Sequence, residues 1–280
     1  MIKNKNIIIF ATAFLMWFSI YSYQSNFTPY MQSLEISPKM IGLILGSYGF
    51  TQMILRVPLG ILSDKLGTRK LFIITGITFT FFSALLLLLS DNVFVILFAR
   101  ASAGVAASAW VSFMVLFSSY HSKDKTVKAT GTLDFFSGTG QLGGIICGSV
   151  LAAYTVWNDK SAFMLALIVG LISFVLSFMI YEDREKLKQN AKKTPDVPQS
   201  GIEKSAGLAE ILSNKTLIVV SVIGAVSQLI TFSTIFGFTP AYAKDILGIN
   251  ALQNGILMVF SYLPTAFGAL FLGRYLTGRV

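Results

Sequence analysis

The chain has 280 residues, of which 54% are hydrophobic and only 12% are charged, and its net charge is +9. Soluble domains carry about 25% charged residues, so this composition excludes an ordinary soluble domain and indicates an all-α membrane protein. The basic residues lie in short stretches between apolar segments, which argues against a nucleic-acid-binding protein.

Eight segments are apolar and long enough to cross a lipid bilayer as helices, which takes about 20 residues each. If the N-terminus is inside, seventeen of the 22 Lys and Arg residues lie on the inner side and three on the outer side. This bias predicts that both chain ends are cytoplasmic in a plasma or inner cell membrane. The expected spans are 7–30, 40–62, 71–90, 92–118, 129–155, 161–181, 216–241 and 252–275.

A short basic turn joins the second and third spans, with the pattern G-x-L-x-D-K-x-G-x-R-K over residues 60–70. Gly60 and Gly67 permit a tight turn and a close approach of helices. Asp64 is placed to accept hydrogen bonds from Arg69 or from a helix N-terminus. The alternative is an ordinary basic cytoplasmic loop, as the positive-inside rule demands.

The pattern of residues 60–70 resembles the loop between helices 2 and 3 of the major facilitator superfamily of secondary transporters. The resemblance implies a bundle of two parallel six-helix halves around a midplane site. It also implies that the loop acts as a conformational latch that stabilises one of the alternating states. The residues that would form the latch are Gly60, Asp64, Gly67, Arg69 and Lys70.

The fourth span contains an arginine, Arg100, roughly 10 Å from its outer end at 1.5 Å per residue. Its surroundings, L-x-x-R-x-x-x-G-x-x-A over residues 97–107, resemble a second pattern of the same family. The resemblance assigns this arginine to proton coupling in exporters. A charge at that depth needs a wet cavity or a partner, unless the side chain extends outward to lipid headgroups.

Of the thirteen acidic residues, only Asp134 falls inside an apolar span. Burial raises the pKa of a carboxyl group toward neutral pH, so Asp134 is the best candidate for a proton-carrying group. Arg56, in the second span, lies at a similar depth from the same face and is a candidate partner for Asp134. Alternatively, each side chain reaches the inner interface separately.

Three glycines of the fifth span, Gly140, Gly144 and Gly148, recur every four residues and predict close helix packing. The run only partly resembles the glycine-rich pattern of antiporters, because the proline of that pattern is missing. Drug/proton antiport is therefore only one interpretation, and plain packing explains the run as well.

The resemblance places the first helix of each half around a central cavity, where polar and aromatic groups orient a substrate. Each candidate is equally explained by a hydrogen bond in helix packing. The candidates are Tyr23, Gln24, Asn26, Gln52, Trp110, Gln141, Gln228 and Thr231.

A Lys- and Glu-rich linker at 182–215 separates an N-terminal half (1–181) from residues 216–280. The sequence Phe-Thr-Pro occurs at 27–29 and again at 238–240, which indicates a parallel repeat. The repeat stops near the chain end, so the expectation is the six-helix half plus the first two helices of an incomplete second half.

These features predict a transporter, rather than an enzyme, that exports small organic solutes such as drugs or sugars by alternating access. The proton gradient supplies the energy, and no cofactor or metal site is expected. The expected partners are a small-molecule substrate and the lipid bilayer. The alternative is a truncated or split protein that does not transport by itself, with a second chain supplying the missing helices.

Overall fold

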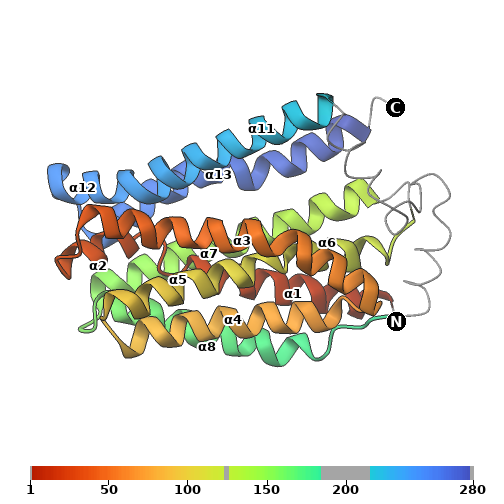
Figure 1. The fold of residues 1–280 in the computed structure, drawn as a ribbon, viewed down its shortest axis with the longest axis horizontal. Helices are drawn as coiled ribbons and strands as arrows, with labels where there is room; N and C mark the ends of the chain where they lie inside the picture. Colours follow the sequence, from red (N-terminus) through yellow and green to blue (C-terminus); the bar gives the residue numbers. More distant parts are fainter. Residues whose placement is uncertain (1, 123–125, 184–214, 278–280) are drawn as a thin grey trace.

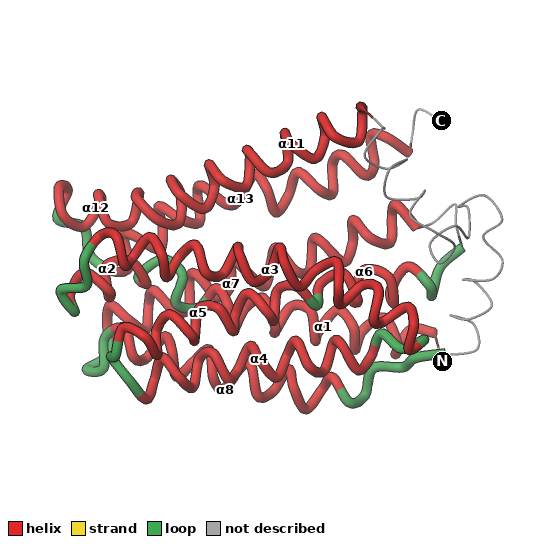
Figure 2. Tube along the Cα trace, in the orientation of Figure 1, coloured by secondary structure: helices red, strands yellow, loops and turns green. Residues whose placement is uncertain are grey.

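The computed structural model describes residues 2–122, 126–183 and 215–277, and within these residues every regular element is a helix (Figures 1 and 2). Most of the linker expected at 182–215 lies outside the described residues. The elements are α1 (Ile2–Tyr21), α2 (Phe27–Ser33), α3 (Pro38–Leu66), α4 (Lys70–Leu89), α5 (Val93–Ser108), α6 (Trp110–Ser118), α7 (Thr126–Tyr154), α8 (Asp159–Ser177), α11 (Lys215–Ile230), η2 (Thr231–Phe238), α12 (Thr239–Leu247) and α13 (Ala251–Thr277).

Six helices within the described residues are long and apolar enough to cross a membrane. They correspond to the second to seventh expected spans, and α13 occupies the position of the eighth. The fourth span, Val93–Ser118, consists of two helices, α5 and α6, which meet at Ala109. The spans identified by length and composition are Pro38–Leu66, Lys70–Leu89, Val93–Ser118, Lys128–Tyr154, Asp159–Ser177 and Val222–Leu247.

The first expected span is not one continuous helix. The apolar helix there is shorter, Lys5–Tyr21, and a turn at 22–26 separates it from α2. A proline ring clashes with the carbonyl group four residues earlier, so Pro29 prevents an uninterrupted helix through Ser25. Serine and asparagine in the turn also compete for backbone hydrogen bonds. The expectation of a span over 7–30 is corrected to α1, a turn and α2.

Figure 1 shows α11, α12 and α13 together along one side of the bundle formed by α1–α8. The start of α1, the residue 66–70 turn and the end of α8 lie at one end of this bundle, which we call the motif-loop end. The short helices α2 and α12 lie together at the opposite end, the α2–α12 end. Helix α13 packs extensively on α7.

The interior of the bundle is built around α1, which contacts both α7 and α8. Apolar side chains such as Ile9, Met16 and Ile20 are completely or almost completely buried. Serine hydroxyls also join helices directly, because Ser19 Oγ donates to the carbonyl oxygen of Ala166 at 2.6 Å. This bond shows that a buried hydroxyl group can find its partner on a neighbouring helix, as a membrane interior favours.

Hydrogen bonds close the α2–α12 end between the α1–α8 bundle and the α11–α13 group. They connect the two groups at positions where α2 meets α12 and where the turn after α1 meets α13. The bonds are Gln32 Nε2 to Asp245 Oδ2 at 2.7 Å, Lys244 Nζ to Pro29 O at 3.1 Å, and Asn254 Nδ2 to Ser25 O at 3.0 Å.

Candidate transport site

Helix α3 ends at Leu66, and Gly67 follows with φ 61° and ψ 29°. This left-handed conformation closes the helix and is adopted without strain only by glycine. The backbone N–H of Gly67 donates to the carbonyl oxygen of Asp64 at 3.1 Å. The turn expected from the sequence is therefore present, with Gly67 at the position that requires a glycine.

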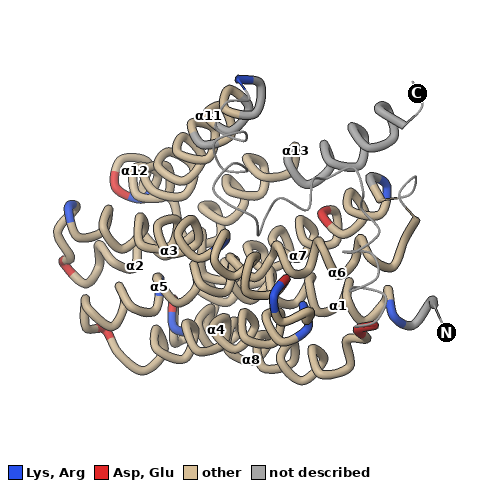
Figure 3. Tube along the Cα trace, turned by 45° about the vertical axis from the view of Figure 1, so that its right-hand side comes forward, with Lys and Arg blue, Asp and Glu red and all other residues tan. Residues whose placement is uncertain are grey.

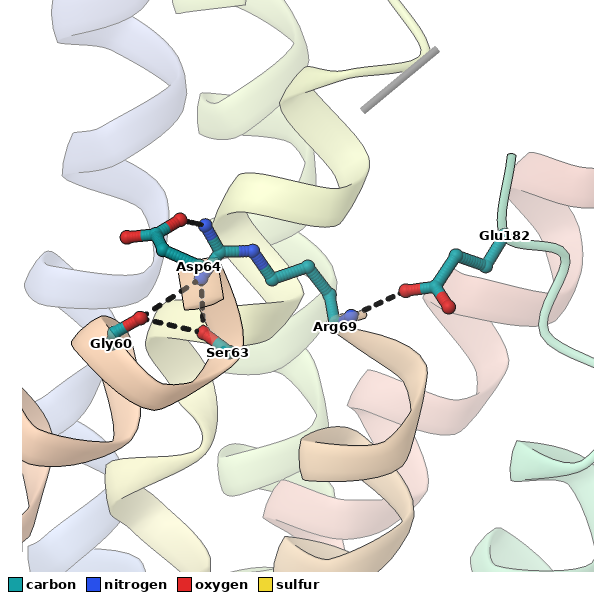
Figure 4. Close-up of polar contacts among 5 residues, drawn as sticks. All are labelled: Gly60, Ser63, Asp64, Arg69 and Glu182. Atoms are coloured by element: carbon teal, nitrogen blue, oxygen red, sulfur yellow. Dashed lines mark hydrogen bonds and ion pairs between the residues drawn. The ribbon is translucent and has the colours of Figure 1, made fainter. Parts of the chain in front are cut away.

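Arg69 is the centre of the polar contacts in this turn (Figure 4). Its guanidinium group donates to the Asp64 carboxylate and to Ser63 Oγ, and reaches the carbonyl oxygen of Gly60 at 3.5 Å. The Arg69 side chain is 10% exposed and that of Asp64 is 67% exposed. Charge-assisted hydrogen bonds of this kind hold a loop in one geometry.

Gly60 contributes differently from the expectation. Nothing lies within 4 Å of the position that a Cβ atom would occupy there. The close helix approach expected at Gly60 is therefore not made within the described residues, because the residue lies on an open part of α3. Its part in the turn is its carbonyl oxygen, which accepts from Ser63 Oγ at 2.8 Å.

An acidic residue that sequence reasoning missed also belongs to this turn. Glu182 accepts from Thr68 Oγ1 at 2.7 Å, from the backbone N–H of Lys70 at 2.8 Å, and from that of Arg69. The Lys70 ammonium group donates to Phe178 O at 2.6 Å. Glu182 stands in a charged run more than a hundred residues from the turn, so no local pattern signals this contact.

Arg100 is 1% exposed and lies inside the bundle, so its side chain does not extend to lipid headgroups. Its Nη2 atom donates to Gln24 Oε1 at 2.9 Å. Its guanidinium carbon lies 4.4 Å from the centroid of the Tyr48 ring and 5.4 Å from that of Phe27. These contacts are cation–π interactions, which are strongest when desolvated.

A cavity of about 210 Å³ lies between the α1–α8 bundle and the α11–α13 group. Six predicted site residues line it, and seven of the thirteen lining residues are aromatic. Most charged residues lie near the ends of helices (Figure 3), so charges in this cavity stand out. The lining consists of Trp17, Tyr21, Tyr48, Gln52, Arg56, Trp110, Asp134, Ser137, Gln141, Gln228, Phe232, Phe236 and Tyr262.

Asp134 and Arg56 both line this cavity. However, no nitrogen–oxygen contact of 4.0 Å or less joins them, so the ion pair expected from the sequence is not formed in this structure. The Asp134 side chain is half-buried, whereas Arg56 is exposed. Both groups therefore face the same cavity without neutralising each other.

The predicted cavity residues divide into two groups. Gln52, Trp110, Gln141 and Gln228 line the cavity, whereas the other four do not. Of these four, Tyr23, Gln24 and Asn26 lie in the turn after α1, which directs them into the packed interior. Thr231 forms a hydrogen bond within its own helix. Tyr23 packs on Phe27 and Phe163, Gln24 binds Arg100, Asn26 is buried before α2, and Thr231 Oγ1 donates to Ser227 O at 2.9 Å.

The aromatic part of the cavity connects the two helix groups. The hydroxyl groups of Tyr21 and Tyr262 lie 3.1 Å apart, and the Tyr21 ring also contacts Phe236. On the other side, Trp17 and Trp110 meet edge to face with ring centroids 5.6 Å apart. Phe232 and Phe236 belong to η2, a π-helical turn of a kind that often occurs at functional sites.

A second hollow of about 250 Å³ lies between α7 and α13. Although it is larger, it is lined almost entirely by apolar side chains and glycine, with Ser149 the exception. It contains no predicted site residue. The smaller cavity is therefore the better candidate for a solute site, because it combines aromatic surface with converging polar groups.

The sequence profile of the Major Facilitator Superfamily matches residues 9–280, almost the whole chain. The chain belongs to this superfamily. Membership in a transporter family confirms the prediction that the protein is not an enzyme, and the all-α bundle has the superfamily fold.

Similar transporters occur in bacteria and yeast. An uncharacterized transporter of Buchnera aphidicola subsp. Schizaphis graminum is 28% identical over 155 residues, which cover 55% of this chain and 39% of that protein. The inner membrane transport protein YajR of Escherichia coli is 34% identical over 103 residues, 36% of this chain and 22% of YajR. An uncharacterized MFS-type transporter, C18.02, of Schizosaccharomyces pombe is 24% identical over 164 residues, 58% of this chain and 36% of the relative. The chain thus spans less than two fifths of the length of these relatives.

Proposed function

We propose that this protein transports a small organic solute across a cell membrane by alternating access through the 210 Å³ cavity. The observation that carries the proposal is the position of this cavity, which lies between two helix groups. Hydrogen bonds join the groups at the α2–α12 end, and packing of α13 on α7 joins them along one side. Relative movement of the two groups would change which end of the cavity is accessible.

The cavity lining favours an aromatic solute over a sugar. Seven aromatic rings offer stacking surface, whereas only Gln52, Gln141 and Gln228 offer amide groups. Sites for drug-sized ligands usually enclose about 300–1,000 Å³, so the smaller volume here favours a single-ring molecule. Sugars remain the second substrate class.

We also propose that the transport is proton-coupled efflux, with both chain ends in the cytoplasm and with Asp134 as the proton-carrying group. Asp134 lies in the cavity, and no Lys or Arg nitrogen among the described residues forms an ion pair with it within 4.0 Å, so its carboxyl group can exchange a proton as the solute enters or leaves. Arg56 in the same cavity would oppose protonation when it approaches Asp134. Arg100, behind the Tyr48 ring, would sense the charge state of the cavity.

An asparagine at position 134 tests this proposal because it keeps the shape of the side chain and removes its titration. In proteoliposomes that contain the purified protein, we expect addition of tyramine, a single-ring aromatic amine, to cause proton movement. Asp134→Asn should abolish the proton movement and retain exchange of labelled tyramine. Glu35→Gln removes an exposed carboxylate on the turn between α2 and α3 and should change neither.

Two results would contradict this account: proton movement that persists in Asp134→Asn, or a response of the wild type to glucose and none to tyramine. The first would remove Asp134 as the proton carrier. The second would replace the aromatic substrate class by a sugar.

The alternative, a protein completed by a second chain, has one observation in its favour. On the face of α3 that carries Gly42, Gly46 and Gly49, no atom of the part of the chain that the structure describes lies within 4 Å of the Cβ positions. The neighbouring Met53 and Val57 are 69% and 66% exposed. Glycines on one helix face typically receive another helix, so we propose that helices equivalent to a complete second half cover this face.

A further inference from the structure

Glu182 caps a helix from a distant part of the chain. It follows α8, and its carboxylate accepts from the backbone N–H groups of Arg69 and Lys70 and from Thr68 Oγ1. These groups lie at the start of α4, where Arg69 is the N-cap residue and Lys70 the first helical residue. Unpaired N–H donors and the helix dipole favour a negative charge at this place. The position of the motif loop is therefore fixed partly by a residue outside it.

The segment around Glu182 is also bound to other helices at the motif-loop end. Lys5 of α1 lies 3.1 Å above the centroid of the Tyr181 ring. The hydroxyl group of Tyr120, just after α6, donates to the carbonyl oxygen of Tyr181. The segment 180–183 thus connects the start of α1, the end of α6 and the start of α4, immediately before the chain continues toward α11.

Arg69 is shared between this segment and the turn. Figure 4 shows its backbone directed to Glu182 and its guanidinium group directed to Asp64. A displacement of Glu182 would move the Arg69 main chain and therefore the anchor of the Asp64 contact. Because the Arg69 side chain is only 10% exposed, it has little freedom to compensate by another rotamer.

We propose that Glu182 is a positioning residue that couples the segment leaving α8 to the motif loop, and through it to the opening of the cavity. It acts through Arg69 on the Asp64 contact and does not touch the solute. The inference rests on the proposed transport function, because it assumes that the motif loop acts as a latch on the conformation of the two helix groups.

Fluorescence quenching by acrylamide tests this coupling, because Trp17 and Trp110 line the cavity and report its accessibility. Trp157, which is 59% exposed, is replaced by Phe in all variants to remove its signal. The full chain is reconstituted in liposomes with Glu182→Ala, with Asp64→Asn, and with both changes. Glu35→Gln is the charge-matched control from the turn between α2 and α3.

We expect Asp64→Asn to change the ratio of molecules whose cavity is accessible to acrylamide to those whose cavity is protected. The change should be at least about fivefold, the lower range of coupling between sites. Glu182→Ala should change it in the same direction, and the double variant should equal Asp64→Asn alone, because both act through one contact. Glu182→Asp should restore part of the wild-type quenching. Glu35→Gln should match the wild type.

Other outcomes overturn the role of Glu182. If Asp64→Asn leaves quenching unchanged, the latch itself fails, and the proposed function loses this element. If Asp64→Asn changes quenching but Glu182→Ala only lowers the thermal midpoint, or if the two effects add, Glu182 is merely a helix cap. If Glu182→Ala does not fold, Glu182→Gln, which keeps an oxygen acceptor and loses the charge, decides between these outcomes by the same measurement.

Discussion

At the scale of single residues, Arg100 shows how the bundle holds a positive charge away from water. Gln24 Oε1 accepts from it, while Arg100 Nε and Nη1 have no hydrogen-bond partner within the described part of the chain. Two aromatic rings cover its guanidinium group. Burial of a charge with few partners is costly, so the single hydrogen bond to Gln24 is expected to contribute to stability.

The hydrogen bond between Gln24 and Arg100 predicts a clear pattern of stabilities. Gln24→Leu should destabilise the protein by about 1.5–3 kcal/mol, because it removes an acceptor from a buried charged donor. The double variant Gln24→Leu/Arg100→Met should recover most of this loss, since both partners are then apolar. Thermal unfolding in detergent measures both. A double variant less stable than Gln24→Leu would show that Arg100 is stabilised mainly by other contacts.

The sequence predicted the polar part of the cavity better than its aromatic part. Gln52, Gln141 and Asp134 stand out because amides and acids inside an apolar span require a reason. Tyr48 and Tyr262 do not stand out, because aromatic residues in a span serve equally well in packing and at the lipid interface. Their part in the cavity follows only from helix rotation, which a single sequence does not determine.

At the scale of elements, the glycines of α7 allow it to lie directly against α1. A Cβ atom at Gly140 or Gly144 would clash with a carbonyl oxygen of α1, and one at Gly148 would clash with Ser22 O, just after α1. The every-fourth-residue spacing therefore predicted the interface correctly, and plain packing accounts for it.

A comparison of two glycines on α7 tests this interface. At Gly148 a Cβ atom meets backbone, which cannot move aside, whereas at Gly143 it meets the Phe18 ring at 3.1 Å, which can. Gly148→Ala should therefore lower the free energy of unfolding by about 1–3 kcal/mol. Gly143→Ala should change the stability by less than about 1 kcal/mol, because the helix propensity of alanine offsets the contact. Equal thermal midpoints for the two variants would contradict the interface.

Span positions were predictable because length and apolarity determine them, but helix interruptions were not. The run from Ile7 to Pro29 is apolar enough to be taken as one span, and the turn at 22–26 became visible only with the structure. Similarly, the cap of α4 by Glu182 depends on where α8 ends in space. Local patterns determine elements, whereas contacts between distant elements determine how the site is held.

At the scale of the whole molecule, hydrogen bonds join the two helix groups at the α2–α12 end, and the cavity lies between the groups. The side chains of Gln32 and Asp245 form one of these hydrogen bonds. Alternating access requires that this end opens during each cycle. The same contact is therefore a place at which the cycle can be stopped reversibly.

The most direct test of transport by alternating access is a cross-link across this contact. The variant carries Gln32→Cys and Asp245→Cys, with the single native cysteine replaced by Cys147→Ser. We predict that oxidation to a disulfide abolishes solute-driven proton movement in proteoliposomes and that reduction restores it, while single-cysteine controls stay active throughout. Undiminished transport by fully cross-linked protein would contradict the account, because solute would then cross without opening of the α2–α12 end.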